Sequence, residues 1–182
     1  MTYNSMKRLD ANLFLHPVVG LTKPGDINHF IRVRCYEHVM KKYSKNSMVL
    51  GILPLAMRMG GPREALLHAI IRKNYGCTHI IVGRDHAGPG KNSQGESFYG
   101  MYDAQDLLKK HQSEIGIKME PFQFMVYIPN KKVYVPFENA KNYKTYKTIS
   151  GSELRDILEK GKEVPDWFTY PEVAFELKKS MP

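Results

Sequence analysis

The sequence has little that would place it in a membrane or in an oxidising compartment. Two of its 182 residues are cysteines, Cys35 and Cys77, and they form no CxxC pair. A disulfide framework is therefore excluded, and both thiols are interpreted as small buried hydrophobic groups. No apolar run reaches the roughly 18 residues that a membrane span needs, and the N-terminus lacks the apolar core of a signal peptide. We expect a cytoplasmic globular protein without membrane partners.

The common motifs of metal and phosphate chemistry are missing as well. The sequence contains no HExxH, GxSxG or P-loop, and its seven histidines show no metal-ligand spacing. We therefore expect no metal site built from protein side chains. His68, in the middle of a predicted helix, is interpreted as packed or solvated. His16, which precedes Pro17 at the end of a predicted strand, is a minor site candidate.

Positive charge is in excess, but it is dispersed. The net charge is +9 and the isoelectric point is about 9.4, yet the lysines form isolated pairs and no basic run of five residues. A basic nucleic-acid-binding protein is one interpretation of such a charge. No aromatic-interleaved RNA-recognition signature accompanies it. We favour a general attraction for small anions such as nucleotide phosphates, and nucleic acid is not the expected partner.

Hydrophobic patterning predicts alternating strands and helices. Asp26 is the predicted N-cap of the first helix, after a turn at Pro24-Gly25. The predicted elements of the first half are strand Asn12–Val19, helix Ile27–Tyr43, strand Met48–Leu55, helix Ala65–Lys73 and strand Thr78–Val82. Those of the second half are helix Ala104–Glu114, strands Met119–Tyr127 and Val133–Phe137, a helix from Ser150 to Gly161 and a last helix after Pro171. The order predicts an α/β fold with a parallel, helix-flanked sheet.

A glycine-rich polar loop follows the third predicted strand. Gly83, Gly88 and Gly90 allow tight turns and close approach of a ligand, and ligands of α/β sheets bind at the carboxyl ends of strands. Arg84 offers a charged fork for phosphate or sulfate, and His86 can donate to an anion. Asp85 is expected to anchor the loop or to pair with Arg84. The alternative is a surface turn held by an Arg–Asp pair.

Two helix starts are further anion-site candidates. Pro62-Arg63-Glu64 opens a helix, where Arg58 and Arg63 could flank an anion, although plain capping with Glu64 near the helix dipole explains the pattern too. Ser150-Gly151-Ser152, with Arg155 one turn later, offers hydroxyls and backbone N–H groups. An ordinary N-cap explains that segment equally well. If both loops bind one ligand, Gly83–Gly90 faces Ser150–Ser152 across a cleft.

Four segments together resemble the ATP sulfurylase (sulfate adenylyltransferase) family. They appear in family order and are VVGLTKPGDI (Val18–Ile27), the stretch Leu53–Gly90 with MRMGGPREA and GRDHAGPG, PFQFMVYIPNKKVYVP (Pro121–Pro136) and Ile149–Val173. The resemblance implies a nucleotidyltransferase-type (Rossmann-like) sheet. Residues 1–147 would be part of the catalytic α/β domain, and residues 148–182 its C-terminal helical segment.

The resemblance also implies an activity and a set of site residues. The family makes adenosine 5′-phosphosulfate and pyrophosphate from sulfate and magnesium-bound ATP. Gly83, Arg84, Asp85 and His86 would contact ATP, with Arg84 and His86 the catalytic pair. The backbone of Ala87 would touch sulfate, and the strand backbone at Met125 would meet adenine.

The sequence departs from the family pattern in ways that limit this expectation. The family's QxRNxxHxxH element, which holds sulfate and stabilises the leaving pyrophosphate, is not present. A cysteine-free stretch, Asn130–Lys147, stands where some members carry a zinc segment, so no structural zinc is expected. No kinase-like extension is expected after Pro182. The chain is thus predicted to be a partial adenylyltransferase that needs a complementary chain or a homo-oligomer. A truncated form, a non-catalytic nucleotide-binding relative or a regulatory module are the alternatives.

Overall fold

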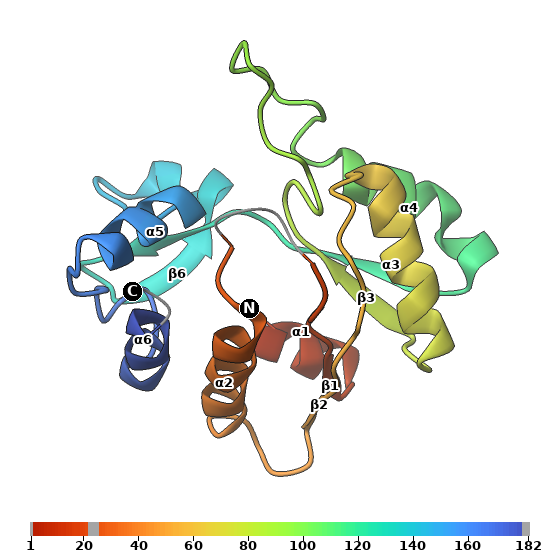
Figure 1. The fold of residues 1–182 in the computed structure, drawn as a ribbon, viewed down its shortest axis with the longest axis horizontal. Helices are drawn as coiled ribbons and strands as arrows, with labels where there is room; N and C mark the ends of the chain where they lie inside the picture. The colour runs from red at the N-terminus through yellow and green to blue at the C-terminus, as the bar shows by residue number, and fades with distance from the viewer. Residues whose placement is uncertain (1, 22–25, 180–182) are drawn as a thin grey trace. The chain divides into compact units, whose positions relative to one another are not determined.

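The computed structural model describes residues 2–21 and 26–179, and they form two compact units. Unit one is residues 57–124, and unit two combines residues 2–56 with the described residues from Met125 onward. Figure 1 shows the elements of both units. The predicted turn at Pro24-Gly25 lies outside the described residues. Residue 147, where the sequence predicts a division, lies inside unit two. The roles predicted for the parts before and after it stay a prediction.

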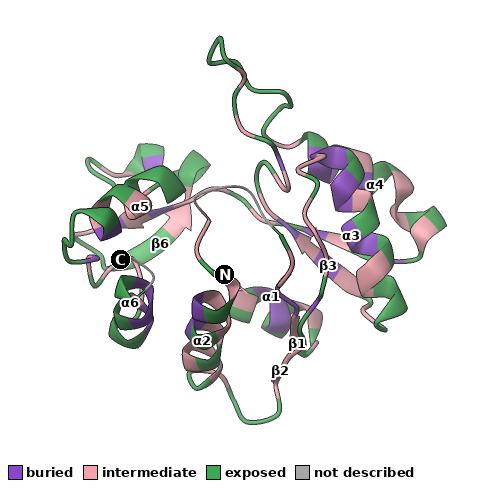
Figure 2. Ribbon diagram, in the orientation of Figure 1, coloured by how far each residue is buried: buried purple, intermediate pink, exposed green. Residues whose placement is uncertain are grey.

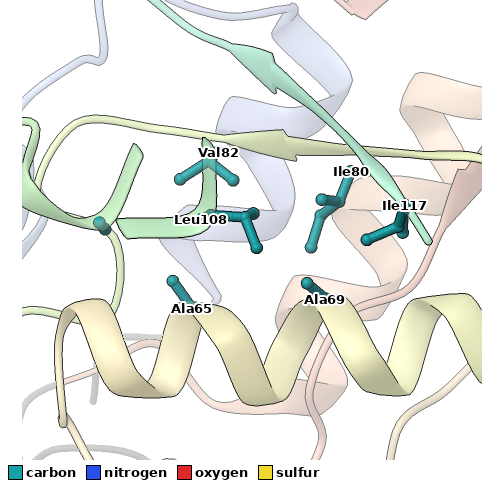
Figure 3. Packing of buried hydrophobic residues seen from close by; sticks show 7 residues of the cluster. Ala65, Ala69, Ile80, Val82, Leu108 and Ile117 are labelled. Carbon is teal, nitrogen blue, oxygen red and sulfur yellow. The ribbon is translucent and has the colours of Figure 1, made fainter. Parts of the chain in front are cut away.

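Unit one consists of two helices that pack beside a parallel pair of strands. Its elements are α3 (Pro62–Asn74), β3 (His79–Val82), α4 (Asp103–Ile115) and β4 (Lys118–Pro121). The strand register runs from His79 opposite Lys118 to Val82 opposite Pro121. Ala65 and Ala69 are four residues apart and therefore lie on the same face of α3. They pack against alternate residues of β3 (Figure 3). The buried cluster is completed by Ile80, Val82, Ala104, Leu108 and Ile117.

The carboxyl ends of β3 and β4 are joined by a buried amide. Gln105, on α4, donates from Nε2 to the carbonyl oxygens of Val82 at 2.9 Å and of Phe122 at 3.1 Å. The backbone N–H of Phe122 also donates to Val82 O at 3.0 Å. Because a buried amide left without partners is costly, these bonds fix the point at which the chain leaves β3. The next segment, residues 91–102, is largely exposed and extends away from α3 and α4 (Figures 1 and 2).

Replacing Leu108 by Ala tests the core of unit one. Leu108 is fully buried, so Leu108→Ala is expected to lower the free energy of unfolding by about 2–5 kcal/mol through lost transfer energy and a cavity. The matched control is Leu67→Ala on α3, where the residue is 42% exposed and the expected change is within about 0.5 kcal/mol. Urea denaturation followed by circular dichroism measures both. Equal losses in the two variants would contradict this assignment of the core.

Unit two contains helices around two further strand pairs. Its helices are α1 (Thr2–Leu9), α2 (His29–Met40), the 3₁₀ helix η1 (Phe137–Asn142), α5 (Gly151–Glu159) and α6 (Pro171–Lys178). The pair β1 (Leu13–Leu15) and β2 (Met48–Leu50) is parallel, whereas β5 (Met125–Ile128) and β6 (Val133–Pro136) are antiparallel. The core of this unit is formed by Ile31, Cys35, Leu158, Val164, Val173 and Leu177.

The predicted α/β class with parallel strands and flanking helices is confirmed. Four details differ. The strands lie in three two-stranded sheets within the described residues, and the predicted strand Met119–Tyr127 is two strands, β4 and β5, that belong to different units. Asp26 as N-cap is wrong: Asn28 caps α2, because its side-chain oxygen accepts from Phe30 N at 2.9 Å. The short helix α1 was not predicted. No helix in the described ranges is long and apolar enough to cross a membrane.

Candidate functional site

The loop Gly83–Gly90 leaves the carboxyl end of β3, as predicted. Three backbone bonds fix its path: Asp85 N donates to Met101 O at 2.8 Å, Gly88 N to Asp85 O at 3.1 Å, and Gly61 N to Ala87 O at 2.9 Å. The last bond ties the loop to the residue before α3. A side chain at Gly61 would meet the ring of Tyr99 at 2.5 Å, and its φ of 54° also favours glycine. The loop is therefore held from two sides within unit one.

Of the three glycines that the sequence suggested for the turns of this loop, Gly90 has a left-handed backbone, and two non-glycine residues share it. Positive φ angles occur at Asp85 (47°) and Ala87 (56°), as well as at Gly90 (95°). Left-handed backbone at a non-glycine residue is uncommon and costs free energy that the surrounding contacts must offset. Such residues cluster at functional sites. The conformation of Asp85 and Ala87 thus marks this loop as a candidate site independently of its side chains.

Arg84 and Asp85 point to different partners. The guanidinium carbon of Arg84 lies 4.0 Å from the centroid of the Phe124 ring, a cation–π contact. The Asp85 carboxylate lies against Gly88, where an added Cβ would come within 1.8 Å of Oδ1. This contact within the loop favours the first of the two roles expected for Asp85, that of anchoring the loop. Arg84 is exposed, and Phe124 was not among the predicted site residues.

His86 is joined to a second histidine inside unit one. Its Nε2 lies 2.9 Å from Nδ1 of His68 on α3, and His68 is buried. Burial lowers the pKa of His68 from 6.5 to about 4, with the charges of His86 and Arg72 acting in the same direction and Glu64 opposing them. The pKa of His86 is lowered as well, first by burial and then by Arg72, against the effect of Glu64. His68 is thus packed, one of the two roles expected for it, but it also touches the site.

Glu64 does more than complement the dipole of α3. Only 4% of the residue is exposed, and its two carboxylate oxygens accept from Arg58 N at 2.8 Å and Gly60 N at 2.9 Å. Its Oε1 also lies 3.6 Å from His68 Nε2. Glu64 thus takes up the backbone N–H groups of Arg58 and Gly60, which supports the capping interpretation of this helix start. An anion between the side chains of Arg58 and Arg63 stays a prediction. The i,i+4 spacing of Glu64 and His68 was the available signal for this pair.

The helix start at Ser150 is an ordinary capping box. Ser150 Oγ accepts from Glu153 N at 3.2 Å, and Glu153 Oε2 accepts from Ser150 N at 2.7 Å. Arg155 donates to the Ser152 hydroxyl at 3.3 Å. These bonds support the capping interpretation of the segment. It belongs to unit two, whereas Gly83–Gly90 belongs to unit one, so the shared cleft stays a prediction.

The other candidates lie in unit two. Met125 is the first residue of β5 and pairs with Pro136, and its role toward adenine stays a prediction. His16 is buried, and its ring lies 4.4 Å from that of Phe14, centroid to centroid. It is therefore a packed residue in this unit. Within residues 2–21 and 26–179, no group of three or more His, Cys, Asp or Glu side chains is arranged to hold a metal ion.

Comparisons with known proteins show the family to which the chain belongs. The ATP-sulfurylase family model matches residues 1–180. The chain is 57% identical to a sulfate adenylyltransferase of Phaeosphaeria nodorum, in an alignment that covers 100% of this chain and 32% of the relative. It is 56% identical to the sulfate adenylyltransferase of Schizosaccharomyces pombe, in an alignment that covers 100% of this chain and 37% of the relative. The structure of a hexameric APS kinase from Thiobacillus denitrificans matches 98% of this chain and 32% of its own, with a TM-score of 0.73 and 26% identity.

The chain therefore spans about a third of the length of the curated relatives it matches. The match extends over nearly every residue of the chain, including the loop Gly83–Gly90 and the helix before it. The chain belongs to the ATP-sulfurylase family.

Proposed function

We propose that this chain carries the nucleotide-binding part of a sulfate adenylyltransferase site, which converts ATP and sulfate into adenosine 5′-phosphosulfate and pyrophosphate. The observation that carries the proposal is the loop after β3, where Arg84 and His86 lie on a backbone fixed by Gly61 and Met101. Family membership supports the same reaction. The location proposed for the chain is the cytoplasm.

The roles proposed for the residues follow from the charge of the reactants. Sulfate oxygen attacks the α-phosphorus of ATP, and pyrophosphate leaves in line, so both reactants are anionic and need fixed positive donors more than a base. Arg84 supplies a permanent charge with fork geometry. His86 supplies a titratable donor, and Gly83 and Asp85 shape the loop around the phosphates.

Two further contacts and a metal ion complete the proposal. The backbone of Ala87 would contact sulfate, and the backbone of Met125 would contact adenine. Magnesium would arrive with ATP, held by its phosphates rather than by a dedicated protein cage, which is the usual way in which proteins bind magnesium nucleotides. We further propose that a complementary chain or a homo-oligomeric partner supplies the QxRNxxHxxH element. No zinc is proposed.

Calorimetric titration of the 182-residue chain tests nucleotide binding directly. The expected result is saturable binding of ATP and of adenosine 5′-phosphosulfate, with one site per chain. A double-stranded oligonucleotide is the comparison ligand, because a basic nucleic-acid binder would prefer it and would lose affinity steeply with salt. Binding of the oligonucleotide without binding of either nucleotide would overturn the proposal.

A non-catalytic nucleotide-binding relative is the second candidate function. It is favoured by the missing QxRNxxHxxH element, because a chain without those donors can keep its nucleotide loop. Such a relative would also bind ATP and adenosine 5′-phosphosulfate, but it would not convert ATP and sulfate into products.

A further inference from the structure

A line of three side chains runs from the interior of unit one to the loop after β3. Glu64 and His68 are both buried on α3, and His86 lies on the loop. The contacts are 3.6 Å from Glu64 Oε1 to His68 Nε2, and 2.9 Å from His68 Nδ1 to His86 Nε2. Neither nitrogen of His68 therefore faces solvent. The two inner residues can act on a ligand only through His86.

The positions of the hydrogens follow from Glu64. Both of its oxygens accept backbone N–H groups, so the carboxylate is an acceptor. It lies 3.6 Å from His68 Nε2, too far for a hydrogen bond, but its negative charge beside this nitrogen favours a hydrogen there. A neutral His68 then has a bare Nδ1, which can only accept. The 2.9 Å contact therefore requires His86 to donate from Nε2. In a neutral His86 this leaves Nδ1 without a hydrogen.

We propose that Glu64 and His68 are positioning residues for His86: they hold it as the Nε2–H tautomer and make Nδ1 the atom that takes up a proton when an anionic group binds. The proton comes from solvent, and the imidazolium that forms donates from Nδ1 to the anion while Nε2–H stays bonded to His68. Glu64 supplies the compensating negative charge. This inference rests on the proposed function, because the anion is the nucleotide phosphate or the sulfate of the product.

The proposal has a definite dependence on pH. The charges that act on His86 are Arg72 and Glu64, both on α3, and burial adds to Arg72 in lowering its pKa. In the ligand-free chain, His86 is therefore neutral near pH 7. A bound anion raises the pKa of His86, so affinity rises as pH falls through the interval between the bound and free pKa values. If binding takes up one proton, the dissociation constant for the anion changes by up to about tenfold per pH unit.

The first experiment needs no ligand. Histidine-labelled chain is titrated by ¹⁵N nuclear magnetic resonance, and the expected neutral state has a hydrogen on Nε2 of both His68 and His86. In Glu64→Gln the pKa of His86 is expected to fall further, because the opposing negative charge is gone. A variant whose loop merely loosens would instead show a pKa that rises toward 6.5, the ordinary value. A hydrogen on Nδ1 of neutral His86 in the wild-type chain would overturn the proposal, whatever the variant does.

Glu114→Gln is the matched control. His111 and Glu114 form an exposed pair on α4 at 3.1 Å, so this variant removes a carboxylate beside a histidine in the same unit. The titration of His86 should not change in it. An equal change in the pKa of His86 in both variants would mean that net charge causes the effect, and it would overturn the role of Glu64.

The second experiment measures proton uptake on ATP binding, by calorimetry in buffers of different ionisation enthalpy between pH 6 and 8. Wild-type chain is expected to take up a fraction of a proton that is largest at a pH between the free and bound pKa values of His86, and Glu64→Gln to lose most of that uptake. Binding of ATP without uptake in the wild-type chain would overturn the proposal while leaving the proposed function intact. Absence of any ATP binding would instead refute the proposed function, and the resonance titration would still decide the roles of Glu64 and His68.

Discussion

The 182-residue chain alone is expected to turn over ATP and sulfate more slowly than a site that includes the QxRNxxHxxH element. Each transition-state donor that the element would provide contributes roughly 3–4 kcal/mol, so the absence of each one is expected to lower the rate by ~10²–10³. The leaving pyrophosphate develops negative charge, and under the proposed function Arg84 and His86 would be the donors that remain to stabilise it. Adding a chain that contains the element is expected to restore phosphosulfate formation. Pyrophosphate release in a coupled assay measures both states.

A matched control separates complementation from simple addition of an active enzyme. The added chain carries the QxRNxxHxxH element but lacks the GRDH loop, and it is assayed by itself and together with Arg84→Ala. Restoration should require both wild-type partners. Ordinary enzymatic turnover by the 182-residue chain alone would refute the expectation. Nucleotide binding without any complementation would favour the non-catalytic relative.

Arg84→Ala is expected to weaken binding of ATP or adenosine 5′-phosphosulfate by on the order of 1.5–3 kcal/mol, the range for a hydrogen bond to a charged group. This corresponds to roughly a 10- to 150-fold higher Kd. The side chain is exposed and rests on one face of Phe124, so its removal creates no core cavity. The free energy of unfolding should therefore stay within about 0.5 kcal/mol of wild type. Calorimetric titration and urea denaturation measure the two quantities.

Two further variants distinguish a specific contact from general charge. Arg84→Lys is expected to recover only part of the affinity, because an ammonium cannot replace a bidentate fork or stack on Phe124 in the same way. Lys110→Ala removes one exposed positive charge from α4 of the same unit, and nucleotide affinity should change little. Unchanged affinity in a folded Arg84→Ala chain that binds ATP would remove Arg84 from the site.

Local pattern was sufficient where an element depends on nearby residues. The helix at Ala65–Lys73 was predicted from apolar spacing and is found as α3, and the β-rich run Thr78–Val82 is found as β3. The capping chemistry of Ser150 was also readable, because a capping box spans four consecutive residues. In contrast, α1 has no acidic residue in its first turn that would indicate a helix start, and it was missed.

The sequence by itself determined the α/β class, the position of the loop after β3 and the family to which its motifs belong. The tertiary structure alone decided what the loop's side chains meet: Arg84 rests on Phe124, and His86 reaches His68, eighteen residues away, with Glu64 behind it. Periodicity reports which face of an element is apolar, because that depends on neighbours in the chain. Contacts between elements depend on the register of β3 with β4 and on how α3 packs beside them, and no local pattern encodes either.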